Sequence, residues 1–226
     1  MAKRQRVEKL GGVEYSGYQA KPKTEGQERY LASLEDTDIR YLAVSGPSGS
    51  GKSFLASYYA VKSLIEEKYQ KIYLTRPPVA SADMRLGFVP GDVSEKMYVW
   101  LLPLIDHIDK FAMNADELLN ADKIEFVSLE YIRGRSLENC IVIATEIQNM
   151  PFDILKCLLT RIDFRSKLIL DGDFNQNDKF KGTTDYEKVC KALNGMERFR
   201  WVQLGKDDII RNKDIAEILE RLEKVE

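Results

Sequence analysis

The chain has 226 residues, of which 44% are apolar and 31% are charged, and its net charge is −2. These values are typical of a soluble globular protein with one sizeable core, and they exclude a chain that attracts nucleic acid by bulk charge alone. Three dispersed cysteines argue against a disulfide framework or a zinc site, and a single histidine, His107, excludes a histidine-based metal site or triad. We expect His107 at a helix surface.

The chain shows no pattern of a secreted or membrane protein. Its first residues lack an apolar signal core, and no stretch approaches the roughly 18 apolar residues that a membrane span requires. The sparse cysteines also suit a reducing compartment. We therefore expect a cytoplasmic protein without a membrane partner.

Residues 1–22 begin with basic residues and continue rich in glycine, tyrosine and lysine. This composition predicts a flexible basic arm, and a solvated tail is favoured over an arm that contacts nucleic acid. Tyr15 and Tyr18 beside Lys21 and Lys23 are the residues that would stack on bases, and a protein interaction surface is the alternative.

Apolar runs and helical patterns alternate along residues 23–226. The expected strands are 41–45, 71–75, 124–127, 140–145, 167–171 and 201–204. The expected helices are 54–65, 93–110, 151–162, 184–193 and 212–225, with Pro103 breaking or kinking the second of them and Pro151 in the first turn of the third. Continuous apolar strands that alternate with helices predict a single α/β domain with a mostly parallel sheet covered on both faces.

The segment after the first of these strands fits the pattern G-x-x-x-x-G-K-[ST] of a phosphate-binding loop. It is followed at once by a helical pattern that begins at Phe54, so strand, glycine-rich turn and helix come in the required order. Backbone N–H groups of such a loop cradle phosphates, Lys52 would reach the β- and γ-phosphates, and Ser53 would hold Mg²⁺. A chance match in a glycine-rich turn is the alternative. The nucleotide-binding candidates here are Gly46, Pro47, Ser48, Gly49, Ser50, Gly51, Lys52, Ser53 and Phe54.

Polar residues follow two later apolar strands. Glu146 comes directly after the strand 140–145, at the end of a strand where ligands bind in open α/β sheets. In P-loop ATPases a glutamate here polarises the attacking water, whereas the alternative is a surface carboxylate at a loop start. The next strand leads into Gly172-Asp173-Phe174-Asn175-Gln176, which is similar to a helicase motif whose glutamine senses the γ-phosphate; Gly-Asp by itself is only a turn signal.

Several further blocks, in order along the chain, resemble the PhoH-like ATPases, a family related to the helicase ATPase core. The similarity runs from about residue 24 to 216, and the short chain resembles the phage-encoded members. The blocks are 46–53, 74–77, 86–92, 95–96, 131–137, Glu146 with Gln148 and Asn149, 159–162, Gly172 and Asp173 with Gln176 and Asp178, and 208–211.

The resemblance implies a RecA-like core that binds ATP and Mg²⁺ and hydrolyses ATP. It further implies a homo-oligomeric ring, with a hexamer favoured, that acts on RNA or single-stranded nucleic acid. Gln27 would read the adenine edge, although a polar residue at a helix start is nearly as good an interpretation. Arg76 would touch nucleic acid or phosphate, and Arg133 and Arg135 would suit phosphate. Arg211 would act as an arginine finger, with Arg161 as the substitute; both arginines could instead be structural.

Two positions depart from the family pattern. Family members usually have Asp-Glu where this chain has Thr145-Glu146, and they often have Thr where this chain has Asp171. In helicase-like sheets the strand that ends at Asp171 lies between the P-loop strand and the strand before Glu146. We therefore hypothesise that the carboxylate that orients Mg²⁺ has moved to Asp171, whereas a turn residue with weak metal affinity is the alternative.

Two other functions compete with an ATPase. A nucleotide-dependent binding or assembly module would bind ATP but hydrolyse little of it, because the acidic pair is altered. A small-molecule kinase with a P-loop is disfavoured by the Gly-Asp-x-x-Gln segment and by the absence of a lid-like arginine cluster.

Overall fold

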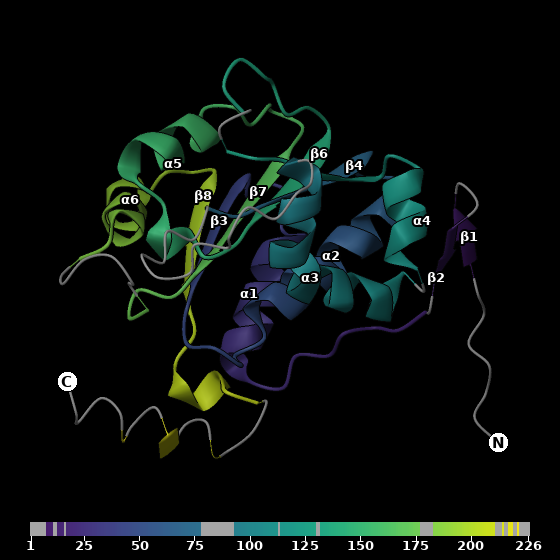
Figure 1. The fold of residues 1–226 in the computed structure, drawn as a ribbon. Helices are drawn as coiled ribbons and strands as arrows, with labels where there is room; N and C mark the ends of the chain where they lie inside the picture. The colour runs from purple at the N-terminus through teal and green to yellow at the C-terminus, as the bar shows by residue number, and fades with distance from the viewer. Residues whose placement is uncertain are drawn as a thin grey trace.

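The computed structural model describes residues 8–10, 13–15, 17–77, 93–112, 114–129, 132–176, 183–210, 214, 217, 218 and 221 (Figure 1). Its elements in chain order are β1 (Glu8–Leu10), β2 (Val13–Tyr15), α1 (Glu25–Glu35), β3 (Tyr41–Ser45), α2 (Lys52–Ile65), β4 (Lys71–Thr75), α3 (Val93–Phe111), α4 (Ala115–Asn120), β5 (Ile124–Phe126), β6 (Cys140–Ala144), the 3₁₀ turn η1 (Ile147–Asn149), α5 (Phe152–Leu159), β7 (Lys167–Gly172), α6 (Asp185–Leu193), β8 (Phe199–Gln203) and the 3₁₀ turn η2 (Lys206–Asp208).

The central sheet has six strands in the order β5-β4-β6-β7-β3-β8, and all its neighbouring pairs are parallel. Strand β7 therefore lies between β3 and β6, as the resemblance predicted. Because parallel strands point the same way, the carboxyl ends of these three strands meet at one edge of the sheet. The short strands β1 and β2 form a separate antiparallel pair.

The central strands are apolar throughout because both faces of the sheet are covered. Every residue of β6 and of β7 is buried, which explains why the sequence shows continuous apolar runs rather than alternation. The predicted strands agree with β3 and β4 at both ends, and with the other four within two residues. The α/β fold with a mostly parallel sheet is confirmed.

Helices cover the two faces in separate groups (Figure 1). Helices α1 to α4 pack against one face, and η1, α5 and α6 pack against the other. From α6, the buried Tyr186 hydroxyl donates to the carbonyls of Val44 (3.0 Å) and Leu170 (2.9 Å). This side chain therefore joins the two neighbouring strands β3 and β7 just before the loops that follow them.

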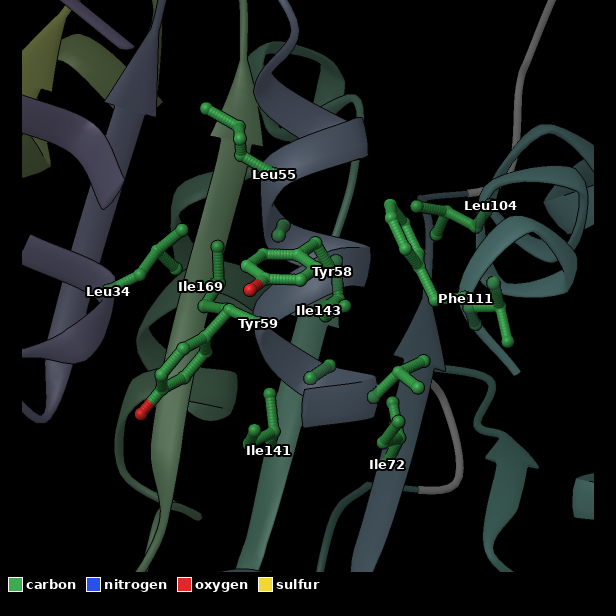
Figure 2. Close-up of a cluster of buried hydrophobic side chains, with 14 of the residues drawn as sticks. Leu34, Leu55, Tyr58, Tyr59, Ile72, Leu104, Phe111, Ile141, Ile143 and Ile169 are labelled. Atoms are coloured by element: carbon green, nitrogen blue, oxygen red, sulfur yellow. The ribbon is translucent and has the colours of Figure 1, made fainter. Parts of the chain in front are cut away.

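Helix α2 is anchored by the larger core. Figure 2 shows Leu55, Tyr58 and Tyr59 of α2 among isoleucines of the sheet, with α3 residues beside them. Burying a large apolar side chain of this kind contributes roughly 1.5–3 kcal/mol. The packing therefore fixes the amino end of α2 at the carboxyl edge of the sheet.

The structure differs from the sequence-based expectations at several places. Helix α3 continues through Pro103 instead of ending there, and Pro151 precedes α5 as its N-cap. Helices α1 and α4 were not expected; they begin directly after Thr24 and Asn114, whose side chains cap them. Tyr15 and Ala20, from the stretch expected to be an arm, are buried in the larger core.

Most of the expected helix 212–225 lies outside the described residues, as does the block 86–92. Within the described ranges, none of the helices combines the length and apolar character that a membrane crossing requires.

Candidate nucleotide-binding site

A cleft of about 610 Å³ opens at the carboxyl edge of the sheet, over the amino end of α2. It brings together most of the residues that the sequence singled out. The lining consists of Tyr18, Lys21, Lys23, Gln27, Ser48, Gly49, Gly51, Lys52, Ser53, Phe54, Leu55, Pro103, Asp106, His107, Lys110, Thr145, Glu146, Gln148, Asp171, Gly172, Asp173, Gln176 and Ile210.

The phosphate-binding loop runs from the end of β3 to the first turn of α2. Gly51 is the N-cap of α2 and has φ = 87°, a left-handed conformation that glycine adopts without steric cost. Glycine offers no side chain to cap the helix, so the first N–H groups of α2 stay available to a ligand. Together with the helix dipole they form a site for an anion.

Lys52 folds back over this loop. Its ammonium donates to the carbonyls of Gly46 (2.7 Å) and Pro47 (3.1 Å) and lies 3.9 Å from Asp171 Oδ1. The side chain is only 11% exposed, so its charge acts in a poorly hydrated place.

The Asp171 carboxylate lies beside Ser53. The Ser53 hydroxyl donates to Asp171 Oδ2 at 2.5 Å, although the two residues are 118 positions apart. Burial raises the pKa of the Asp171 carboxyl, while the Lys52 ammonium and the Ser53 hydroxyl lower it. Thr145 follows the strand beside it, one position beyond the Ala144–Leu170 pair. This is the geometry that a carboxylate moved to Asp171 requires; its role with Mg²⁺ stays a prediction.

Glu146 is held at the start of η1. It has φ = 56° and ψ = 36°, a conformation that costs on the order of 1 kcal/mol for a residue with a side chain. Gln148 Nε2 donates to Glu146 Oε2 at 2.7 Å, and Gln148 Oε1 accepts the N–H of Asp173 at 3.1 Å. Burial raises the pKa of the Asp173 carboxyl, which accepts the N–H of Asn175.

Gln27 braces the loop from α1. Its Nε2 donates to the Ser50 carbonyl (2.9 Å), and its Oε1 accepts the N–H of Lys23 (2.9 Å). Both ends of the amide are therefore bonded to backbone, and only 2% of the residue is exposed. The adenine-reading role of Gln27 stays a prediction, and in this structure the amide holds the loop.

The segment after β8 braces the same loop from the other side. The N–H of Ile210 donates to the Gly49 carbonyl at 3.2 Å. The Asp208 carboxylate accepts the Thr24 hydroxyl and the N–H of Gly205. The start of α1, the phosphate-binding loop and the segment after β8 thus form one connected wall.

The predicted arginines lie apart from this cleft. Arg76 donates to the Trp100 carbonyl of α3 at 3.2 Å. Arg135 pairs with Glu125 at 3.0 Å and lies over the Tyr73 ring, while Arg133 is exposed. None of these three arginines is among the described residues that line the cleft.

The two finger candidates stay predictions. Arg161 is half-buried in the turn after α5, and Arg211 lies outside the described residues. The predicted γ-phosphate sensor, Gln176, is exposed and lines the cleft, and its N–H donates to the Asp173 carbonyl.

Sequence reasoning missed the wall that α3 contributes to the cleft. Asp106, His107 and Lys110 line it, and the His107 ring packs edge-on against Phe54 with centroids 5.7 Å apart. His107 is thus half-buried in the cleft rather than on an outer surface. The helical spacing of these three polar residues in an apolar helix was the available signal.

Gln148 was also missed as a functional residue. In the sequence, Gln148 is only one residue of a block that resembles the family, because a glutamine near a strand end carries no chemistry of its own. Its significance depends on two partners, Glu146 and Asp173, and the second of these follows another strand.

The donor set fits a nucleotide phosphate with a hard cation. N–H groups at a helix start and a buried lysine suit phosphate, and a hydroxyl beside a carboxylate supplies oxygen ligands. The described residues contain no cluster of three His, Cys, Asp or Glu side chains that could hold a metal by itself. Mg²⁺ does not need one, because it is held by one or two protein oxygens together with phosphates and water.

The family follows from comparison with known proteins. The sequence model of the family described as PhoH-like protein matches residues 19–223. The chain belongs to the PhoH-like protein family. It is 36% identical over 211 residues to a PhoH-like protein of Bacillus subtilis, covering 92% of this chain and 65% of the relative. It is 31% identical to Protein PhoH of Escherichia coli, covering 90% of this chain and 60% of that protein.

This PhoH-like chain therefore spans about three fifths of the length of these curated relatives. Solved structures show the same fold at low identity. The large terminase of a thermophilic bacteriophage, solved in complex with ADP, matches with a TM-score of 0.53 at 11% identity, over 88% of this chain and 49% of that one. The UvsW helicase of bacteriophage T4 matches with a TM-score of 0.50 at 11% identity, over 84% and 61%. The RecA-like α/β fold is confirmed.

Proposed function

We propose that this PhoH-like chain binds ATP in the cleft and hydrolyses it. The observation that carries the proposal is the Ser53–Asp171 contact beside Lys52, at the uncapped start of α2. A lysine, a hydroxyl and a carboxylate meet there, and Glu146 lines the same cleft. This is the set of groups that phosphoryl transfer to water requires.

Each group has a separate role in the proposed reaction. The loop N–H groups and Lys52 bind the β- and γ-phosphates, and Glu146 orients a water and accepts its proton as the water oxygen bonds to the γ-phosphorus. The bond from that phosphorus to the bridging oxygen breaks, which leaves ADP and inorganic phosphate. Ser53 and Asp171 would hold Mg²⁺, which when bound neutralises charge that develops on the phosphate oxygens.

Lys52 gives the first test. Lys52→Ala removes the ammonium that balances phosphate charge in a poorly hydrated loop, so ATP binding or turnover should fall by at least about tenfold, on the order of 1.4 kcal/mol. ATP binding is measured by calorimetry and turnover by phosphate release. Lys156→Ala, at an exposed position of α5, is the matched control and should behave like the unaltered chain. Normal turnover by the Lys52 variant would contradict the proposal.

A second candidate is a nucleotide-dependent binding or assembly module that hydrolyses little ATP. It is favoured by Thr145, which lies buried at the end of β6 where the family usually has a carboxylate. The two candidates differ in one measurement. An unaltered chain that binds ATP by calorimetry but releases phosphate no faster than the Lys52→Ala variant would support the module.

We further propose that the active unit is a homo-oligomeric ring, with a hexamer favoured, and that it acts on RNA or single-stranded nucleic acid. The family membership supports both parts, and Lys21, Lys23 and Tyr18, which line the cleft, support the contact with nucleic acid. Turnover should rise with a single-stranded RNA or DNA panel, and a mass measurement in solution should give the ring. A monomer of unchanged activity with every nucleic acid would contradict both parts.

A further inference from the structure

We propose that Gln148 is a positioning residue for ATP hydrolysis, which places the Glu146 carboxylate and ties it to the turn that follows β7. This inference rests on the proposed ATPase function and deepens it. In this proposal Gln148 does not itself bind phosphate or metal or activate water. It acts through two neighbours, Glu146 and Asp173.

The Gln148 amide is bonded at both ends. Nε2 donates to Glu146 Oε2 at 2.7 Å, and Oε1 accepts the N–H of Asp173 at 3.1 Å. An amide turned over by 180° would set its oxygen against the carboxylate and its NH₂ against an N–H, so the two partners together determine its orientation. The side chain has one arrangement that satisfies both, and the Glu146 carboxylate is held in a matching one.

The surroundings make this link rigid. Gln148 is 5% exposed, and η1 packs against both β7 and α6. A Cβ added at Gly172 would lie 2.9 Å from Gln148 Oε1 and 2.9 Å from Tyr186 Cε1. The absence of a side chain at Gly172 is therefore what lets the glutamine reach the N–H of the next residue.

The two hydrogen bonds of Gln148 connect two parts of the cleft, and these parts would contact different portions of the nucleotide. Glu146 follows β6, whereas Asp173 follows β7, the strand that also carries Asp171 to Ser53. Because Gln148 bonds to both sides, a displacement of Gly172 and Asp173 would move the Glu146 carboxylate, which comes after the neighbouring strand β6. The glutamine thus makes the position of Glu146 depend on the segment beside the phosphate-binding loop.

Glu146 needs such support because its backbone does not hold it unaided. Its left-handed conformation persists only where the surroundings impose it. The hydrogen bond from Gln148 ties the Glu146 side chain to a buried group. Loss of that bond should leave nucleotide binding intact and misplace the carboxylate, and small misplacements of a catalytic group are costly in rate.

The test is a double-mutant cycle between Gln148→Met and Glu146→Gln, measured on the full chain. Methionine keeps the length and burial of the side chain but makes neither hydrogen bond. Gln148→Met should lower kcat by about tenfold to a hundredfold while the KM for ATP changes by less than about threefold. In the Glu146→Gln background the same change should lower the single-turnover rate by less than about twofold, because its effect passes through Glu146.

Gln70→Met is the matched control, since Gln70 is exposed just before β4 at the opposite edge of the sheet. It should leave kcat unchanged. Equal losses from Gln148→Met in both backgrounds would overturn the proposal, and so would a rise in kcat or a loss confined to KM. Thermal unfolding of each variant shows whether a loss of rate reflects a loss of fold.

A structural measurement keeps the proposal separate from the ATPase function. If the unaltered chain binds ATP but hydrolyses none, the proposed function fails and the kinetic cycle has no signal. Crystal structures with ADP and with a non-hydrolysable ATP analogue then decide about Gln148. An amide within hydrogen-bond distance of Glu146 in at least one of them supports the link, and an amide beyond about 3.5 Å in both overturns it.

Discussion

The interpretation of Asp171 changes more between sequence and structure than that of any other residue of the candidate site. In the sequence it is one carboxylate before a Gly-Asp turn. In the structure it lies buried against Ser53 and near Lys52, an arrangement that the predicted role of a carboxylate orienting the water shell of Mg²⁺ requires. Burial raises the pKa of the Asp171 carboxyl most, Lys52 and Ser53 lower it, and the acidic neighbours Glu146 and Asp173 raise it further, so a cation would complement this group.

This predicts a metal-dependent effect of Asp171→Asn. The amide can still accept the Ser53 hydroxyl but no longer carries charge, so half-maximal activity should require about ten to a hundred times more Mg²⁺. ATP turnover measured over a range of Mg²⁺ concentrations gives the comparison. Unchanged dependence on Mg²⁺ would leave Asp171 as a turn residue.

The exchange of residues supplies the control for that prediction. Thr145, directly after β6, and Asp171, near the end of the neighbouring strand β7, lie in matched register, so either position can present a carboxylate to the same place. The double change Thr145→Asp with Asp171→Thr should retain activity that Asp171→Thr alone lacks. Equal inactivity of the single and double variants would count against a carboxylate that has moved sideways.

At the scale of elements, the start of β7 is joined to the end of α1 by a buried lysine. Lys167 is 1% exposed, and its ammonium donates to the carbonyls of Leu34 (2.5 Å) and Asp36 (2.8 Å). It also lies 5.1 Å from the centre of the Tyr59 ring. These bonds satisfy carbonyls that the end of a helix leaves without partners, and a cation there complements the helix dipole.

Burial lowers the pKa of Lys167 from 10.5 to about 8. Because the folded chain then releases this proton at a lower pH than the unfolded chain, stability should rise with pH from about 8 to about 10.5. Relative to Lys167→Met, the free energy of unfolding should increase by up to about 3 kcal/mol across that window. Urea unfolding of both proteins at several pH values measures the difference.

Taking the difference between two variants is essential here, because buried tyrosines and cysteines with raised pKa values act in the opposite direction at alkaline pH. Those groups are common to both proteins and cancel. For Lys156→Met, at an exposed position, the free energy of unfolding should change with pH in the same way as for the unaltered chain. Parallel curves for Lys167→Met as well would refute the buried-lysine effect.

The whole molecule raises the question of assembly. Arg211 was predicted to reach the nucleotide of a neighbouring copy, and such an arginine is worth about a thousandfold or more in rate. In this structure the residue before it, Ile210, bonds to the phosphate-binding loop of its own chain. The chain therefore reaches its own cleft one residue before Arg211. Arg211 could complete the site of its own copy or that of a neighbouring copy, and both possibilities need testing.

Mixing inactive variants separates the two arrangements. If the site is completed between copies, Arg211→Ala mixed with Lys52→Ala should regain part of the activity, because some sites then combine an intact lysine with an intact arginine. Phosphate release from mixed oligomers, confirmed by mass, is the measurement. No recovery would count against a site completed by Arg211 of a neighbouring copy, and full activity of Arg211→Ala alone would leave Arg161 as the finger candidate.

Much of the architecture could be predicted from local pattern. Apolar runs located the six strands of the sheet, and the spacing around Lys52 located the phosphate-binding loop, because both depend on residues adjacent in sequence. Helices α1 and α4 were missed, since α1 is mostly polar and α4 is short. Helix α3 runs through Pro103, so the predicted break is wrong, because packing of α3 against α2 outweighs the lost hydrogen bond; a kink there stays a prediction.

The fold class, the family and the predicted phosphate-binding loop can all be inferred from the chain alone, because strand, turn and helix signals are local and such a loop binds through its backbone groups. Which distant side chains share the cleft became visible only in the folded chain. The order of β6, β7 and β3 brings Asp171 to Ser53 and lets Gln148 join Glu146 to Asp173, while Arg76, Arg133 and Arg135 lie elsewhere. Such pairings depend on strand order and on which face each side chain takes, and no local pattern in the chain encodes them.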